Sequence, residues 1–298
     1  MIASATALLL FAAADRDRHP NFEGVWDYST ATPLERTKEY ENRFQFTPAE
    51  ARDFERKVPE AAISDDDDEK KLNADVVGDL STADFGRVDP SLRTSIIVNP
   101  YDGKRPPRTD AAKARGTMRE AVGKAKDDPE AMELSERCLP DVAGPPIIPG
   151  AYNNNFRIVQ TPTAIVIATE MINEPRVVWM DGRPHPPAAI GKWNGDSLGR
   201  WDGETLVIDT TNFADRWAVG GFSASRHVVE RLTLVDRNAL VYEFRVEDPK
   251  TFTAAYEGKY TIRRTSNQIF EFACHEANYS IVNMLRGARA AERRDGRD

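Results

Sequence analysis

The chain has 298 residues, of which 40% are hydrophobic and 30% charged, and its formal net charge at pH 7 is -8. This composition is typical of a soluble globular protein with an acidic surface. No basic stripe runs through the body of the chain, which argues against a nucleic-acid partner. The one basic cluster, within residues 286–297, is interleaved with acids and is expected to be a solvated helix end.

The first residues predict a signal peptide over residues 1–14. An apolar run from Ala7 to Ala14 ends in three alanines, which fits a small-x-small cleavage site before Asp15. The run is too short to span a bilayer as a helix. No Lys or Arg precedes it, so either translation starts further upstream or the segment is not a signal. We expect an exported, periplasmic or extracellular protein without a membrane span.

The two cysteines, Cys138 and Cys274, lie far apart in the sequence. An oxidising compartment favours a disulfide between them, and closing a loop of this length contributes roughly 4–5 kcal/mol in the chain-entropy model. The alternative is two unrelated buried thiols, as in a cytosolic protein.

Short elements are predicted near the start of the mature chain. Residues 21–26 read as a short strand with Trp26 as an aromatic anchor. Thr47-Pro48-Ala49-Glu50 is a capping box with proline at the first helical position. This pattern predicts a helix over residues 48–57.

The segment between this helix and the strand-rich half is polar. The acidic run at residues 64–71 is expected to be a solvated or disordered loop, because its spacing matches no calcium loop. A strand is predicted over residues 93–98 and a surface helix over residues 109–126. We assign residues 15–143 to one region that packs on the β-rich core. Residues 144–150 form a rigid Pro-Gly connector.

Beyond the connector the hydrophobic period becomes two, which is typical of strands. Alternation and turn signals predict strands over residues 164–172, 176–180, 205–211, 227–235, 240–247, 256–264 and 268–275, with a final helix over residues 279–294. Seven or eight antiparallel strands at hairpin spacing predict a mainly β fold for residues 144–298. A barrel or a sheet curved on itself, lipocalin-like in logic, removes exposed edges. A two-sheet sandwich is the alternative.

Three histidines and one glutamate carry the catalytic hypothesis. His185, His227 and His275 lie in the strand-rich half, and histidine suits proton transfer near neutral pH. Glu170 shares a strand face with apolar residues, so its carboxylate must be paired, protonated or part of a site. The alternative is a structural role for each histidine and a buried pair with Arg157, Arg176 or a histidine for Glu170.

Polar and aromatic side chains near turns are the candidate substrate-binding residues. Residues 193–201 place aromatics, a carboxylate and an arginine around two glycines, and Ser197 is predicted to be a turn residue. The asparagines at 153–155 can bond sugar hydroxyls or cap neighbouring backbone. The candidate substrate-binding residues are Tyr152, Asn154, Asp196, Arg200, Trp201 and Arg231.

No cofactor is expected, but zinc or iron is an alternative. The ligands would be His185, His227, His275 and Glu170, which have to converge from separate strands because no His-x-His or His-x-x-x-His spacing exists. The missing P-loop and Rossmann glycine pattern argue against phosphate transfer and nicotinamide chemistry.

Several ordered sequence blocks resemble a large family of exported, largely uncharacterised bacterial proteins. The resemblance covers roughly residues 22–291 and implies export and a shared architecture, without an activity. Two positions depart from the family pattern: its His-Asp is Asn173-Glu174 here, and its Arg is Leu198. A mechanism that needs a histidine at position 173 therefore does not operate in this chain. The blocks are Ser135–Leu139, Gly144–Pro146, Tyr152–Phe156, Ile158–Pro162, Asp181–His185, Gly195–Trp201, Asp209–Phe213, His227–Arg231, Ala273–Tyr279 and Arg286–Arg289.

Three functions are compatible with these residues. The first is a lyase, isomerase or hydrolase that acts on a small sugar-derived, terpenoid or aromatic compound in a barrel cavity. Its acids and bases are the three histidines and Glu170, and Arg200 or Arg231 steadies developing negative charge. The second is a non-catalytic barrel that binds a small ligand. The third is a structural or envelope-associated protein.

Overall fold

The computed structural model describes residues 19–63, 86–125, 128–132, 134, 136–139, 144–150, 152–173, 175–214, 221–276 and 278–296. The predicted signal peptide and the acidic run at 64–71 lie outside these residues. Three long helices are present in the described part: α2 (Pro48–Ile63), α5 (Asp110–Ala125) and α6 (Tyr279–Arg294). The helix predicted from the capping box therefore begins as expected at Pro48 and continues past residue 57.

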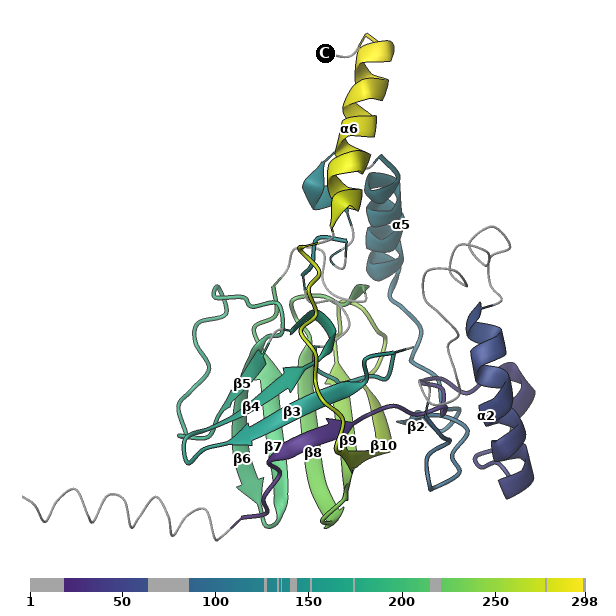
Figure 1. Cartoon of the computed structure of the whole chain (residues 1–298), viewed down its shortest axis with the longest axis vertical. Coiled ribbons are helices and arrows are strands. Elements are labelled where there is room, and N and C mark those ends of the chain that lie inside the picture. Colours follow the sequence, from purple (N-terminus) through teal and green to yellow (C-terminus); the bar gives the residue numbers. More distant parts are fainter. Residues whose placement is uncertain are drawn as a thin grey trace, which may run out of the picture.

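One ten-stranded sheet dominates the structure, and nine of its strands close into a barrel (Figure 1). The order is β1-β3-β4-β5-β6-β7-β8-β9-β10, and β1 pairs again with β10 to complete the circle, while β2 adds to β10. The strands are β1 (Gly24–Asp27), β2 (Ile97–Asn99), β3 (Asn155–Gln160), β4 (Ala164–Thr169), β5 (Pro175–Trp179), β6 (Asp196–Asp202), β7 (Thr205–Thr211), β8 (His227–Asp236), β9 (Ala239–Glu247) and β10 (Tyr256–Thr265). The mainly β barrel predicted from the strand pattern is confirmed.

The barrel is mixed, because β5 and β6 run parallel. Only Val178 and Trp179 of β5 pair with β6, opposite Ser197 and Leu198. A parallel pair needs a crossover connection, and residues 180–195 supply it. The other neighbouring strands are antiparallel, as predicted, although β1 and β3 lie far apart in the sequence.

The strand predicted over residues 268–275 does not form. Both sides of β10 are occupied, by β9 on one side and by β1 and β2 on the other. An alternating segment placed after β10 therefore finds no free edge, and these residues run without a ladder. The side chain of Phe270 in this segment is 68% exposed.

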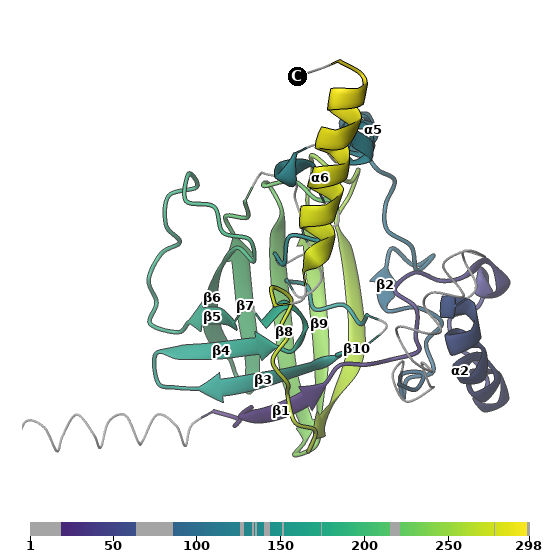
Figure 2. The ribbon, with the colours of Figure 1, turned by 45° about the horizontal axis from the view of Figure 1, so that its top comes forward.

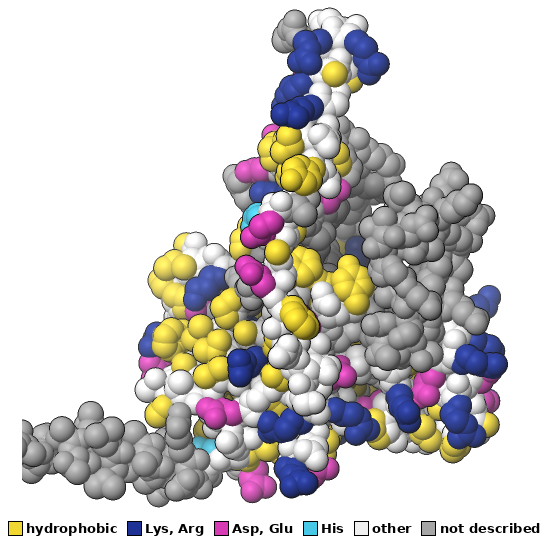
Figure 3. All heavy atoms as spheres, in the orientation of Figure 1, with side chains coloured by type: hydrophobic (Ala, Val, Ile, Leu, Met, Phe, Trp, Pro, Cys, Tyr) yellow, Lys and Arg dark blue, Asp and Glu magenta, His cyan; other side chains and the backbone are white. Residues whose placement is uncertain are grey.

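Helices α5 and α6 lie beyond one end of the barrel, whereas α2 lies beside its flank (Figures 1 and 2). A disulfide joins Cys138 to Cys274, with 5.8 Å between the Cα atoms, and confirms the predicted pairing. None of the side chains described in α6 is buried, and Figure 3 shows Lys and Arg side chains toward its C-terminal end. Within the described residues, no helix combines the length and apolar character needed to cross a membrane.

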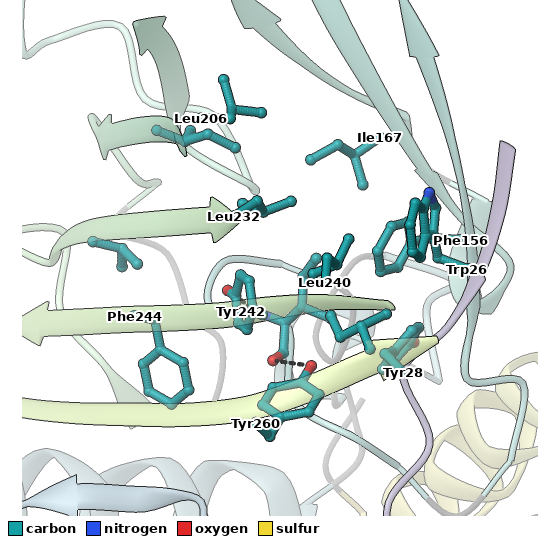
Figure 4. Close-up of a cluster of buried hydrophobic side chains, with 14 of the residues drawn as sticks. Trp26, Tyr28, Phe156, Ile167, Leu206, Leu232, Leu240, Tyr242, Phe244 and Tyr260 are labelled. Atoms are coloured by element: carbon teal, nitrogen blue, oxygen red, sulfur yellow. Dashed lines mark hydrogen bonds between the residues drawn. The ribbon is translucent and has the colours of Figure 1, made fainter. Parts of the chain in front are cut away.

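The barrel interior is filled with side chains (Figure 4). Tyr242, Phe244 and Tyr260 point into it together with aliphatic residues of the other strands. The predicted Pro-Gly connector enters this core: the backbone N–H of Ile147 donates to the hydroxyl of Tyr242 at 2.9 Å. The hydroxyl of Tyr260 donates to the carbonyl of Ile147 at 3.0 Å. Two tyrosine hydroxyls of the barrel therefore satisfy the buried peptide groups of the connector at Ile147.

A buried ion pair completes the interior. Arg176 of β5 donates from both terminal nitrogens to the carboxylate of Glu230 on β8. Both side chains are almost fully buried, and the hydroxyl of Tyr242 donates to Glu230 at 2.7 Å. Burial opposes the charged form of Arg176, but the negative charge of Glu230 outweighs it and holds the arginine pKa above its usual value.

Candidate functional site

A polar pocket of about 450 Å³ opens at the barrel rim, where β1 and β4 end and β3 begins. We call it the rim pocket. Segments far apart in the sequence meet there, because the antiparallel pairs β1–β3 and β3–β4 bring those strand ends together. The lining residues are Asp27, Ser29, Asn153, Asn154, Asn155, Glu170, Asn267, Gln268 and Phe270.

Unusual backbone conformations flank this pocket. Asn153 has φ of 54° and Ile172 has φ of 64°. Asparagine tolerates the left-handed region, but a β-branched residue there is strained by about 1–3 kcal/mol. Such strain persists where the surrounding structure holds it, and it concentrates at functional sites. The left-handed conformation of Ile172 lies in the turn between β4 and β5, directly after Glu170.

Glu170 is the buried acid of the rim pocket. Its side chain is 6% exposed. One carboxylate oxygen accepts a hydrogen bond from Nδ2 of Asn155 at 2.8 Å, and the other accepts one from the backbone N–H of Phe270 at 3.3 Å. No Lys, Arg or His in the described part of the chain pairs with it. Glu170 is therefore a buried carboxylate whose donors, among the described residues, are all neutral.

The burial of Glu170 has a different origin from the one expected. The sequence placed it with Val166 and Ala168 on an apolar, inward face, but these two are half-buried, whereas Ile165 and Ile167 are buried. Glu170 lies just past the end of β4, where the segment containing Phe270 covers it. The expected arginine partners are also elsewhere: Arg157 is exposed and Arg176 binds Glu230.

A second carboxylate, that of Asp27, lines the same pocket. It accepts a hydrogen bond from the backbone N–H of Ser29 at 2.8 Å. Burial, followed by the negative charges of Glu170 and Asp27, raises the pKa of the neighbouring Tyr28 above its usual value. Both carboxylates therefore act on one small region of the rim.

The neighbouring asparagines Asn154 and Asn155 have different roles. The side-chain oxygen of Asn154 accepts from the backbone N–H of Gly150 at 2.8 Å, and its nitrogen donates to the carbonyl of Gly150 at 2.9 Å. Asn154 thus caps backbone, which was one of the two alternatives, although it also borders the pocket. Asn155 orients Glu170. Tyr152 is 44% exposed and does not line the rim pocket.

Two predicted histidines meet on the outer wall of the barrel. Nδ1 of His185 lies 3.0 Å from Asp196, and its Nε2 lies 3.1 Å from Asp209. The other oxygen of Asp209 lies 2.9 Å from Nε2 of His227. We call these four residues the wall network. Asp209 was missed in the sequence, although its outward position on β7 beside β8 follows from the register Thr210–Val228.

The wall network ties a loop to the barrel. Each ring nitrogen of His185 faces a carboxylate, so both are already engaged. Burial opposes ionisation of Asp196, but hydrogen bonds from Lys192 and His185 outweigh it and lower its pKa below the usual value. Asp196 therefore pairs with Lys192 and His185, and no bond joins it to Arg200. The network fixes the crossover between β5 and β6.

The remaining predicted residues do not join either cluster. His275 is exposed in the turn before α6. Arg200 is exposed on β6, and Arg231 pairs with Asp202 at 2.9 Å. Trp201 is a packing residue, with its ring stacked on that of His19 at a centroid distance of 4.5 Å.

Ser197 and the hypothetical metal ligands also differ from the expectations drawn from the sequence. Ser197 is a buried strand residue that bonds the hydroxyl of Thr210 at 2.9 Å, so its prediction as a turn residue is wrong. Cross-strand pairing of β6 with β7 explains this, because the sequence block reads as a turn only when taken alone. Of the four hypothetical metal ligands only His185 and His227 come together, at Asp209. The described residues contain no group of three or more His, Cys, Asp or Glu arranged to hold a metal ion.

In a comparison with known proteins, no family model, curated protein or solved structure matches this chain. The resemblance to exported bacterial proteins stays a prediction. The functional interpretation therefore rests on the geometry of the rim pocket.

Proposed function

We propose that this chain is an exported enzyme that performs acid–base chemistry on a small sugar-derived compound in the rim pocket, with Glu170 as the general base. The observation that carries the proposal is a buried carboxylate that faces a polar pocket and has no cationic partner in the described residues. Buried charges in proteins are normally paired, so a buried carboxylate at a pocket without such a partner is a candidate functional group.

The position of Glu170 suits a base. Asn155 and the N–H of Phe270 each hold one of its oxygens, so the carboxylate is oriented while lone pairs remain for a substrate proton. A general base has to lie within hydrogen-bond reach of the proton that it removes. Asp27 offers a second carboxylate in the same pocket, and two carboxylates in different environments can divide the acid and base roles.

The pocket lining favours a hydroxylated substrate over a terpenoid. Asn153, Asn267 and Gln268 present amide groups, which donate and accept hydrogen bonds. Phe270 adds an exposed aromatic face on which the apolar side of a sugar ring can pack. A few convergent polar groups beside an aromatic surface are typical of small-molecule sites.

Export is part of the proposal and has separate support. Disulfides persist in oxidising compartments and are rare in the cytosol. The disulfide between Cys138 and Cys274 therefore favours a periplasmic or extracellular location. Fractionation of expressing cells, with mass measurement of the mature N-terminus, tests this part.

The catalytic part is tested with the isosteric variant Glu170→Gln. Wild type and variant are incubated with a panel of neutral and acidic monosaccharides and their methyl glycosides, and conversion is followed by NMR. We expect kcat to fall by about 10²–10⁴-fold, the range typical of a lost general base. The matched control is Glu204→Gln, in the exposed turn between β6 and β7, with unchanged turnover.

The same panel separates the two leading functions. If wild type binds a panel compound and never converts it, the chain is the non-catalytic binding barrel. If folded Glu170→Gln converts the compound as fast as wild type, Glu170 is not the base and the proposal is wrong.

A further inference from the structure

A second pocket, of about 920 Å³, lies next to the rim pocket. Asp27 and Ser29 line both pockets, so the two are adjacent at the end of β1. We call it the arginine pocket, because four of its lining residues are Arg52, Arg56, Arg87 and Arg263. Figure 3 shows Lys and Arg side chains gathered over α2 and the neighbouring barrel edge, interspersed with acids.

Three separate elements bring these arginines together. Arg52 and Arg56 lie one helical turn apart on α2 and share a face. Arg263 points outward from β10 and pairs in register with Asp27. Arg87 is held through its carbonyl, which accepts hydrogen bonds from the loop that follows β1. The fold therefore brings these arginines together from segments that are far apart in the sequence.

In the described part of the chain, three of these four guanidinium groups have no carboxylate partner. Arg56 donates to Asp53 on the same helix. Among the described residues, no carboxylate pairs with Arg52, Arg87 or Arg263. Within the described residues these three guanidinium groups therefore form no direct ion pair, although the net charge of the whole chain is -8.

The acids that line the pocket, Asp27 among them, accept hydrogen bonds from backbone N–H groups of the pocket wall. Asp89 is buried and accepts from the backbone N–H of Thr261 at 2.6 Å and from Ser91 at 2.9 Å. Glu55 accepts from the backbone N–H of Val88 at 2.8 Å. These bonds fix the pocket wall, and since no described carboxylate pairs with Arg52, Arg87 or Arg263, these three side chains can receive an anion.

We propose that the arginine pocket binds the carboxylate or phosphate group of the substrate, whose hydroxylated part occupies the rim pocket. Guanidinium forks match both anions in geometry and form strong charge-assisted hydrogen bonds. The substrate class is then an acidic sugar derivative. This inference rests on the function proposed for the rim pocket, because it extends the same binding site past Asp27.

The probes are glucuronate, glucose 6-phosphate, inorganic phosphate and neutral glucose, titrated by calorimetry into the full chain at low ionic strength. The test variant is Arg87→Gln/Arg263→Gln, and the matched control is Arg237→Gln, in the exposed turn between β8 and β9. We expect at least one anionic sugar to bind wild type and control alike, and the double variant about tenfold or more weakly. Binding also weakens as salt is added. The two acidic sugars distinguish a carboxylate from a phosphate ligand.

Failure of this inference is distinguishable from failure of the proposed function. Glu170→Gln is expected to bind the anionic probe as wild type does, while losing turnover. Equal anion binding by wild type and the folded double variant overturns the inference, as does the absence of saturable binding of all three anions. Neither result affects a rim pocket that converts neutral sugars.

Discussion

Two buried glutamates in this barrel have opposite surroundings. Glu230, in the interior, is fully buried. It accepts two hydrogen bonds from Arg176 and one from the hydroxyl of Tyr242. Glu170, at the rim, is almost as buried but is held by Asn155 and one backbone N–H, and it borders a pocket.

The difference shows that burial does not by itself identify a reactive carboxylate. The bonds to Glu230 compensate its charge, and it lines neither the rim pocket nor the arginine pocket, so it acts as a packing element. Glu170 keeps both its access to a pocket and its capacity to accept a substrate proton. The partners of a buried acid therefore distinguish a structural carboxylate from a candidate functional one better than its degree of burial does.

The largest effect is expected from breaking the interior pair. Arg176→Met leaves the charge of Glu230 unpaired in the core, so the free energy of unfolding should fall by about 3–5 kcal/mol. Urea denaturation followed by tryptophan fluorescence measures this. The exposed Arg200→Met is the control, with a change within about 0.5 kcal/mol. A loss below about 1 kcal/mol for Arg176→Met would show that the pair is not needed for the fold.

The disulfide is expected to rank next. Replacing Cys138 and Cys274 together by serine should lower the free energy of unfolding by about 2–4 kcal/mol. The bridge also lies close in sequence to Phe270, which covers Glu170. Amide hydrogen exchange should therefore quicken at Phe270 more than in β8 and β9. Uniformly faster exchange would mean that the bridge supports the barrel as a whole and not the rim.

A smaller effect on stability is expected at the rim itself. Glu170→Gln keeps an oxygen that can accept from Asn155 or from Phe270, and it orphans no cation. The free energy of unfolding should change by no more than about 1 kcal/mol, whereas Glu230→Gln should cost more because Arg176 loses its counter-charge. Parallel urea titrations of the two variants give this comparison. Equal losses would remove the distinction between the two glutamates.

The smallest expected effect is a pH dependence at the wall network. The pKa of Asp196 is lowered from its usual 3.8, so folding favours its ionised form. Its contribution to stability is complete above about pH 4 and is lost as pH falls through the lower, folded-state pKa. Asp196→Asn should flatten the acid limb of stability against pH. An unchanged acid limb would place the responsible carboxylates elsewhere.

The sequence predicted the parts of this structure that depend on local pattern. The residues of β7 and α6 match the predicted ranges, because alternation and helical spacing are read along one segment. The disulfide followed from the compartment argument. The failed strand at 268–275 could not be recognised in the same way, since its fate depends on whether an edge of the distant strand β10 is free.

The candidate site was predictable only in part. Glu170 was singled out as a polar residue in an apolar stretch, although the face was assigned wrongly. Asp27 and the arginine pocket were missed, because their residues converge from distant segments such as α2 and β10. The histidines were attractive by residue type, but cross-strand register places His227 on the outer wall with Asp209.

The most direct test of the central claim is an NMR titration of the isotope-labelled protein with the panel compound that wild type binds most tightly. The rim pocket account predicts that the first saturable shifts appear at the backbone amide of Phe270 and the side-chain amide of Asn155, whose protons bond Glu170. Shifts that instead saturate at the rings of His185 and His227, with Phe270 and Asn155 unmoved, would contradict it and place ligand binding at the wall network.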